Sequence, residues 1–479
     1  MSGLSGLIAG AGGNTEANLL AARWLMALSL GFHIVLSCLG VAFPTLIYLA
    51  HRRGLRDDDV DALALARRWS KAAAVLFAVG AVSGTALSFE MGMLWPGLMG
   101  TFGDVMGLPF ALEGIFFFLE AIFLGIYLYG WKGLPARLHL ATLIPIGLAG
   151  IFGTFCILAV NGWMNEPTGF DLATYRATGE VVDVEPWRAM FNGSVLPQFL
   201  HMLPATYMVT GFGVASVYAV GWLRGRRDRL HRLGVVIGFT VGAVTAPIQL
   251  ITGDLAARNV AADQPAKFAA IELLETTTAG APMTLGGVIV DGKKVGAIEI
   301  PDLTSLLQSF DPNATITGLD AVPPDRRPPV NVVHLSFQLM VGIGMSLLTL
   351  AAFSGWKRWR TGELPTATWW YRLVALTGPA AVLALEAGWT TTETGRQPWI
   401  AQQVMLVEDA VTPRDGIGLV LAGFVVVYLG LGASAWFVLR SMSNRWRAGG
   451  DPPTPYGPTE ERSHDAGDGG AAGRVEVAH

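Results

Sequence analysis

Charge is scarce in this sequence. Only 15% of its 479 residues are Asp, Glu, Lys or Arg, whereas 52% are hydrophobic, and the formal net charge is −4. Soluble domains typically carry about a quarter of charged residues, so this composition excludes an ordinary water-soluble protein. It also offers no basic surface for a nucleic acid. The chain is expected to have lipid as its main solvent.

Cysteine is almost absent as well. Cys38 and Cys156 both lie in apolar stretches, and two isolated thiols form neither a disulfide framework nor a zinc site. Residues 1–18 contain no Lys or Arg, so they lack the positive segment that begins a cleavable signal peptide. We therefore expect the first apolar run to remain in the protein as a membrane span.

Long apolar runs are what the sequence has in abundance. A run of about 20 apolar residues is long enough to cross a bilayer as a helix. The pattern predicts an all-α, polytopic membrane bundle of nine helices. The expected spans are residues 20–50, 69–94, 107–130, 138–163, 196–222, 233–253, 331–355, 368–390 and 415–440.

The charges between the runs predict an orientation. Every connection that follows an odd-numbered run is basic, as in Arg52–Arg68 and Arg224–Arg232, whereas the connection 164–195 is rich in Asp and Glu. Lys and Arg concentrate on the cytoplasmic side of membrane proteins. We therefore expect an N-terminus outside the cell and a cytoplasmic C-terminus.

These patterns divide the chain into five parts. Two of them are not membrane: the loop is too long and too rich in Asp, Pro and Gly for a mere connector, and the tail is too polar to fold. The parts are an outer segment 1–19, helices one to six in 20–253, an outer binding loop 254–330, helices seven to nine in 331–445 and a disordered cytoplasmic tail 446–479.

Few polar side chains interrupt the apolar runs. A polar group inside a bilayer is costly, so such residues are candidates for a functional site. Glu113 and Glu120 lie two turns apart on one helix face, about 10 Å apart in depth. Most of the group is expected in the outer half of the bilayer, with Glu120 and His33 deeper. The candidates are Arg23, His33, Glu113, Glu120, His201, Met340, Glu393 and Arg396.

These side-chain types are those that bind iron porphyrins. An imidazole and a thioether on facing helices give a six-coordinate haem that transfers electrons, and His201 with Met340 fits this case by depth. A single His or a carboxylate leaves an iron position open for oxygen, as His33 and Glu393 would. Each residue also has an ordinary interpretation, because a lone His or Met often only packs, and a carboxylate pair also suits a transporter.

One stretch is more specific than any single residue. Gly388–Trp399 reads G-W-T-T-T-E-T-G-R-Q-P-W and follows the eighth apolar run. Its spacing resembles the signature of subunit I of cytochrome bd-type quinol oxidases. Other blocks resemble that family in the same order: Arg23 ten residues before His33, then Leu112–Glu120, Asn161–Pro167, Gln198–His201, Lys267–Glu272 and Phe337–Gly342.

The resemblance implies a haem-containing subunit of a terminal respiratory oxidase in the bacterial cytoplasmic membrane. His201 and Met340 would bind a low-spin haem b. His33 and Glu393 would bind two high-spin haems, one of type b and the other of type d or a third haem b, with Glu113 beside the oxygen-binding iron. Which of these two residues binds which high-spin haem stays open.

The resemblance also implies supporting residues around the haems. Arg23 and Arg396 would pair with haem propionates or stabilise the Glu393 carboxylate, and Trp389 would contact a cofactor. Glu120, as the deepest carboxylate, would relay cytoplasmic protons to oxygen. Glu386 lies seven residues before Glu393 and either joins this network or is an ordinary carboxylate near the helix end.

The outer loop is assigned to substrate binding by the same resemblance. Lys267 and Glu272 would hydrogen-bond a quinol and accept its protons on the outer side, so that charge is separated without proton pumping. The family implies a second large membrane subunit and a small single-helix subunit as partners. The loop lacks the long insertion of some members, and the quinone type stays open.

Two residues near Met340 raise further questions. Gln338 stands where some members have an arginine; the loss of this positive charge favours the oxidised haem and predicts a lower potential. His334 also lies near the outer surface and is a competing ligand.

Two other functions remain possible from the residues alone. A proton-coupled secondary transporter would explain the pair Glu113 and Glu120, but we find no internal repeat of the kind many transporters show. A haem b electron-transfer subunit without oxygen chemistry would explain His201, but such proteins usually pair histidines on two helices, and this spacing is missing here.

Overall fold

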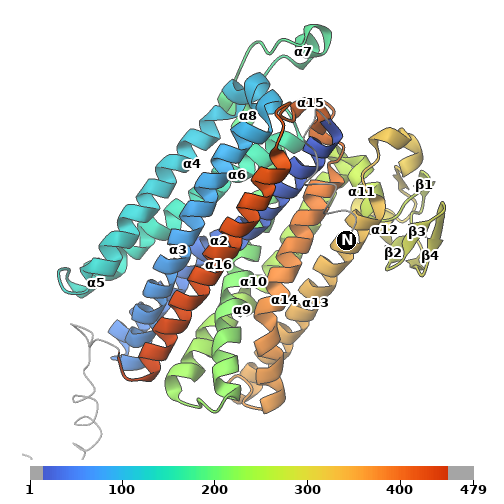
Figure 1. Cartoon of the computed structure of the whole chain (residues 1–479). Helices are drawn as coiled ribbons and strands as arrows, with labels where there is room; N and C mark the ends of the chain where they lie inside the picture. Colours follow the sequence, from blue (N-terminus) through green and yellow to red (C-terminus); the bar gives the residue numbers. More distant parts are fainter. Residues whose placement is uncertain (1–14, 451–479) are drawn as a thin grey trace, which may run out of the picture.

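The computed structural model describes residues 15–450, which form a bundle of long helices (Figure 1). Nine helices in this range are long and apolar enough to cross a membrane, which confirms the predicted fold class. Their bounds are α2 (Thr15–Arg56), α3 (Val60–Leu94), α4 (Pro96–Gly130), α6 (Leu143–Asn165), α9 (Val195–Leu223), α10 (Arg229–Asp263), α13 (Val330–Thr361), α14 (Thr368–Gly395) and α16 (Ile417–Arg447).

Several helices begin or end beyond the predicted apolar runs. Asp59 caps α3, because its side chain accepts a hydrogen bond from the Ala62 amide. α4 has a proline at its first position, where the missing N–H costs nothing. As α4 begins at Pro96 rather than near 107, Glu113 lies close to the middle of that helix. The expected position of Glu113 in the outer half of the bilayer stays a prediction.

The two ends of the bundle differ in what connects the helices. We call the end that carries residues 264–329 the loop end, and the end that carries the arginine-rich connections the basic end. Short helices α7 (Leu172–Thr178), α8 (Pro186–Met190) and α15 (Val407–Ala410) lie at the loop end, and α5 (Ala136–Ala141) lies at the basic end (Figure 1). Residues 1–14 and 451–479, which hold most of the two predicted terminal segments, are outside the described range.

The loop 264–329 has its own small structure. The predicted loop began at 254, but α10 continues to Asp263. The loop then holds helices α11 (Pro265–Ile271) and α12 (Leu303–Ser309) and the 3-10 turns η1 (Leu319–Ala321) and η2 (Pro324–Arg326). Its strands form three antiparallel pairs: β1 (Thr278–Ala279) with β6 (Thr315–Ile316), β2 (Met283–Leu285) with β5 (Ile298–Ile300), and β3 (Val288–Val290) with β4 (Lys293–Val295).

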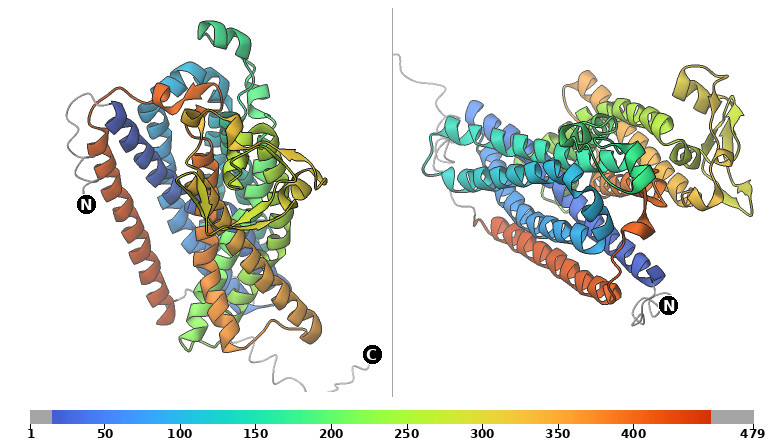
Figure 2. Two further views of the ribbon diagram at one scale, coloured as in Figure 1. Left: turned by 90° about the vertical axis from the view of Figure 1, so that its right-hand side faces the viewer. Right: turned by 90° about the horizontal axis from the view of Figure 1, so that it is seen from above.

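Helix α2 joins two groups of helices. α9 packs on α10 and α14, and α13 packs on α14, while α4 packs on α6 on the other side. α2 contacts α3, α6, α9 and α16 (Figure 2). The α9–α10 contact is close because Gly211 faces Gly242, where a Cβ atom would lie 2.7 Å from the Gly242 nitrogen. Side chains of α2 therefore reach both groups.

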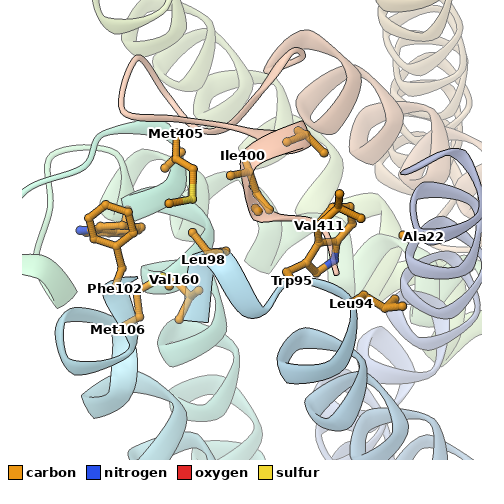
Figure 3. Close-up of a cluster of buried hydrophobic side chains, with 14 of the residues drawn as sticks. Ala22, Leu94, Trp95, Leu98, Phe102, Met106, Val160, Ile400, Met405 and Val411 are labelled. Carbon is orange, nitrogen blue, oxygen red and sulfur yellow. The ribbon is translucent and has the colours of Figure 1, made fainter. Parts of the chain in front are cut away.

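A buried apolar cluster fixes the segment that follows α14 (Figure 3). Here β7 (Trp399–Ala401) pairs with β8 (Met405–Leu406), and the chain packs over the loop ends of α3, α4 and α6. The Thr412 amide donates to the Leu94 carbonyl at 2.9 Å, and the Gln402 amide donates to the Met164 carbonyl at 2.8 Å. These contacts hold the start of the segment, and therefore Arg396, against α6.

Candidate functional site

Glu393 and Arg396 form an ion pair where α14 ends. The Arg396 Nη2 atom donates to Glu393 Oε2, and Asn161 of α6 donates from Nδ2 to Glu393 Oε1 at 2.7 Å. Only 4% of Arg396 is exposed. Its Nε and Nη1 atoms have no hydrogen-bond partner among the described residues. A buried guanidinium with two unused donors is suited to another acidic group.

The hydrogen bonds continue from Glu393 to the loop. Asn165 donates from Nδ2 to the Asn161 side-chain oxygen at 3.0 Å and to the Asn161 backbone carbonyl at 2.9 Å. Lys267 of α11 donates from Nζ to Asn165 Oδ1 at 3.2 Å. Lys267, the expected substrate residue, is thus connected to Glu393, the expected iron ligand, through two asparagines.

Lys267 is a buried amine that lies near the positively charged Arg396. It is 3% exposed, and its stem lies against Gly395, where a Cβ atom would be 2.6 Å from Lys267 Cγ. Burial, and then the nearby Arg396 guanidinium, lower the pKa of Lys267 to about 7, against the opposing effect of Glu393. The amine is therefore able to gain or lose a proton near neutral pH.

Glu272 lies on another side of α11 from Lys267. Its Oε2 atom accepts from the Thr304 hydroxyl at 3.1 Å, in α12 rather than in the membrane bundle. Burial raises the pKa of Glu272 to about 7, and the Thr304 hydrogen bond opposes the shift only in part. The two expected quinol residues therefore have partners in different elements, although both are buried and both titrate near neutral pH.

Met340 lies on α13 against α14. A Cβ atom on Gly388 would be 2.7 Å from the Met340 sulfur, so any larger residue here would displace the thioether. Gly388 is the first residue of the Gly388–Trp399 stretch. The predicted ligand and the motif are therefore in direct contact.

His201 lies on α9 and faces α10. The Gln249 amide nitrogen is 3.1 Å from Nδ1 and 3.2 Å from Nε2 of His201, and a Cβ atom on Gly253 would be 3.3 Å from its ring. Gln249 Oε1 has no partner among the described residues. α9, α10, α13 and α14 pack together, so His201 and Met340 belong to one helix group.

His33 lies in a polar seam between α2 and α3. Its Nδ1 is 2.8 Å from the Ser83 hydroxyl and its Nε2 is 2.9 Å from the Ser37 hydroxyl. One turn before His33, the Ser29 hydroxyl donates to Glu90 Oε1 at 2.7 Å. Glu90 is fully buried, and its second oxygen has no partner among residues 15–450. Sequence reasoning missed this carboxylate.

Glu120 faces the contact between α2 and α6. Its carboxylate oxygens lie 3.5 Å from the Cβ position of Gly40 and 3.6 Å from that of Gly150. Glu113 is seven residues earlier on the same face of α4, as predicted from the helical repeat. Neither residue belongs to the hydrogen-bonded group around Glu393, so the structure separates the α4 carboxylates from the loop-end site.

The remaining candidates, Arg23, Glu386 and Trp389, lie in or beside the Gly388–Trp399 motif. Arg23 donates from Nη2 to the Gln397 side-chain oxygen at 2.9 Å. Glu386 lies against Gly31 of α2, with 3.3 Å between Oε2 and the Cβ position, and Trp389 is 3.9 Å from the same position. Glu386 Oε1 has no partner in the part of the chain that the structure describes. The Glu393 hydrogen bonds do not include Glu386.

His334 and Gln338 form hydrogen bonds to backbone carbonyls of the loop 264–329. His334 is fully buried, with Nδ1 2.7 Å from the Ile271 carbonyl and Nε2 3.0 Å from the Gly286 carbonyl. Gln338 donates to the Thr284 carbonyl at 2.9 Å. Both His334 ring nitrogens therefore face backbone carbonyls, whereas the partners of His33 and His201 are side chains that can rotate away from the ring. This difference argues against a ligand role for His334.

Comparison with known proteins decides the family. Residues 21–446 match the family of cytochrome bd terminal oxidase subunit I. The chain belongs to this family. A Bacillus subtilis strain 168 protein, named as subunit I of a cytochrome bd menaquinol oxidase, is 33% identical over 432 residues, which is 88% of this chain and 96% of the relative.

Two further relatives agree. Subunit 1 of the cytochrome bd-II ubiquinol oxidase of Escherichia coli strain K12 is 26% identical over 80% of this chain and 87% of the relative. The solved structure of bd oxidase from Geobacillus thermodenitrificans has a TM-score of 0.84 and 35% identity, and covers 89% of this chain and 98% of that one. The protein is thus a multi-pass cell-membrane subunit of a haem-containing terminal quinol oxidase that has a second subunit. The transporter and electron-transfer alternatives do not account for this family match.

The residues of this bd-type subunit fit haem groups. Haem carries two propionates, and the buried Arg396 has two unused N–H donors to receive such an acid. The thioether of Met340 and the imidazoles of His33 and His201 are iron-binding groups. Further unsatisfied buried oxygens on Glu90, Glu386 and Gln249 lie on α3, α14 and α10, which pack against α2, α13 and α9. This donor set is unlike that of a core built only for packing.

Sequence reasoning found the charged members of the site but not the amides that join them. Asn161 and Asn165 were noticed only as part of a motif. Their spacing of four residues on an apolar helix places both on one face, as with any i, i+4 pair. This signal was available, since an amide at the end of a membrane helix needs a partner as a charge does.

Proposed function

We propose that this subunit oxidises quinol on the outer side of the membrane and reduces oxygen to water with cytoplasmic protons, building a proton motive force without pumping. One observation carries the proposal. At the loop end, a buried lysine is connected through two asparagines to a carboxylate, which is paired with a guanidinium that has free donors. Such a group is costly in a protein without a ligand to use it.

The proposed orientation rests on charge. The basic end carries Arg52, Arg53 and Arg56 at the end of α2, and the arginines of 224–232 where α9 is followed by α10. By the positive-inside rule this end is cytoplasmic, and the loop end is outside. Protons released at the loop end then enter the outer space.

The proposed haem residues divide into two sets. His201 and Met340 hold a low-spin haem b, while His33 and Glu393 hold the high-spin haems, b and either d or a third b, with Glu113 near the oxygen site. When bound, these groups supply the one-electron chemistry that connects quinol to oxygen. Arg396 neutralises the Glu393 carboxylate and offers its remaining N–H groups to a propionate.

Proton supply to oxygen must come from the basic end. Glu120 is the proposed relay on α4. Seven residues further, about 10 Å along the helix, the Tyr127 hydroxyl is 2.9 Å from His51 Nδ1, and His139 Nε2 is 2.7 Å from the Tyr127 carbonyl. These polar groups continue the face of Glu113 and Glu120 toward the cytoplasm, which supports an inward-reaching path.

Quinol oxidation requires acceptors for two protons. We assign Lys267 and Glu272 to this role, because both are buried and both have a pKa of about 7. Lys267 would act from the bundle side of α11 and Glu272 from the loop side. The complex would contain subunit II and a small single-helix subunit.

The test is oxygen consumption by the purified complex in vesicles, driven by quinol. We expect oxygen uptake with acid appearing on the side of the loop end and alkali on the side of the basic end. A complex that contains haem but consumes no oxygen with quinol would contradict the activity. Acid release on the basic side would contradict the orientation alone.

A further inference from the structure

The asparagine pair of α6 does more than fill space between the two charged ends of the site. The two asparagines and the charged residues at either end form one row of hydrogen bonds. Lys267 donates to Asn165, Asn165 donates to Asn161, and Asn161 donates to Glu393. Every donor in the row points the same way, from the amine to the carboxylate. Hydrogen bonds aligned in this way polarise and strengthen one another.

The charges at the two ends fix the direction of both amides. Protonated Lys267 has only donors, so Asn165 must present its oxygen to it. Ionised Glu393 has only acceptors, so Asn161 must present its nitrogen. Turning either amide over would place a donor against a donor or an acceptor against an acceptor. The orientation of Asn161 therefore depends on Lys267, although the two residues do not touch in this row.

Burial makes the loss of any hydrogen bond in this row costly. Asn165 is 2% exposed and Lys267 is 3% exposed, so water does not replace a lost partner at either residue. An unpaired amide in such a place is destabilised, and its neighbours rearrange to satisfy it. A movement of the lysine amine away from Asn165 consequently changes the hydrogen bond from Asn165 to Asn161.

We propose that Asn161 and Asn165 are positioning residues that couple Lys267, at the quinol end of the site, to the Glu393 carboxylate. When Lys267 turns its amine to a quinol hydroxyl, Asn165 loses its donor and the hydrogen bond from Asn161 to Glu393 changes. Occupation of the substrate site thereby alters the surroundings of the iron ligand. This inference rests on the proposed roles of Lys267 and Glu393.

The experiment is a double-mutant cycle on the purified complex, read by redox titration of the high-spin haems. Lys267→Met removes the amine at one end of the row, and Asn165→Leu removes the connection with a side chain of similar size. We expect Lys267→Met to shift the high-spin midpoint potential in the native background. In the Asn165→Leu background the shift should fall to less than about half, because coupled residues depart from additivity.

Two further variants keep the test sharp. Asn165→Asp retains an acceptor for Lys267 but removes both N–H donors to Asn161, and is expected to uncouple the ends as Asn165→Leu does. Asn192→Leu is the matched control. Asn192 is also buried beside α6, but its amide only donates to the Ala159 and Ala189 carbonyls at 3.0 and 2.9 Å, and its substitution should leave the Lys267→Met shift intact.

The outcomes separate the two proposals. An equal shift on Lys267→Met in the native and Asn165→Leu backgrounds overturns the coupling, since the lysine would then act through space alone. The intact low-spin spectrum shows that each variant has folded. A native complex without quinol-driven oxygen uptake would instead overturn the proposed function.

Discussion

The two ends of the helix bundle both bury charged groups, but they use them differently. At the basic end, Asp59 accepts hydrogen bonds from Arg53 at 2.8 Å and from Arg229 at 2.5 and 2.6 Å. Arg232 donates to two backbone carbonyls and to the Tyr371 hydroxyl at 2.7 Å. At the loop end, Arg396 donates from one nitrogen to Glu393, and its other two nitrogens have no partner among the described residues.

This difference in hydrogen bonding distinguishes charged residues that stabilise the fold from charged residues that bind a ligand. A charge that holds helices together is satisfied by the protein itself, since otherwise its burial would destabilise the fold. A charge that serves a ligand keeps part of its hydrogen-bonding capacity unused. By this criterion Asp59 and Arg232 stabilise the bundle, whereas Arg396, Lys267 and their partners form a site.

The largest expected effect is the loss of Glu393. Glu393→Gln removes the anionic ligand and the ion pair with Arg396, so oxygen consumption per low-spin haem should fall about 100-fold. The control is Arg232→Gln at the basic end, which should change turnover by less than about two-fold. Equal losses in both variants would show that the two ends do not differ in function.

The next effect is on pH dependence. Lys267 and Glu272 each have a pKa of about 7, and each accepts a proton only in its deprotonated form. Protonation below pH 7 removes that form, so kcat/KM for quinol should fall about ten-fold per pH unit there for each group required. Glu272→Gln should lower kcat/KM and make the acid limb shallower. An unchanged slope in this variant would remove Glu272 from proton transfer.

At the basic end the expected effect is on stability. Burial alone would raise the pKa of Asp59, but hydrogen bonds from Arg229 and Arg53 outweigh it and lower the value to about 2. The stabilisation is therefore present above the ordinary carboxyl pKa and is lost as pH falls through about 2. Asp59→Asn should lower the free energy of unfolding by about 2 kcal/mol, measured by denaturation at neutral pH. Turnover per haem should not change, and a stable but inactive variant would contradict the assignment.

The smallest effect is expected for His334. His334→Gln loses one of two hydrogen bonds to loop carbonyls, so the KM for quinol should rise by roughly two- to ten-fold, as for the loss of about 1 kcal/mol. The low-spin haem spectrum should remain, because both His334 ring nitrogens face backbone carbonyls. Disappearance of that spectrum with Met340 in place would make His334 a ligand.

The helices and the charged site residues could be predicted from the sequence because both depend on local patterns. Apolar runs fix the spans, and Glu113 and Glu120 share a face by the helical repeat alone. Helix ends were harder, since Asp59 and Pro96 extend α3 and α4 past their apolar runs. This extension moved Glu113 toward the middle of its helix.

What could not be predicted was how distant segments meet. Lys267 and Glu272 are five residues apart and were both expected to bind the quinol, but the sequence did not indicate that one contacts α6 and the other α12. Asn165 joins Lys267 across 102 positions, and Asn161 joins Glu393 across 232. Such contacts follow from tertiary packing, which hydropathy and residue spacing do not predict.

The most direct measurement is the reduced-minus-oxidised spectrum of the purified complex with Met340→Leu beside the native form. Leucine keeps the apolar volume against Gly388 but has no sulfur to bind iron. We predict that the low-spin haem b signal disappears while the high-spin signals, which depend on His33 and Glu393, remain. A low-spin signal that survives this substitution would contradict the assignment of Met340 and the placement of the haem site on these helices.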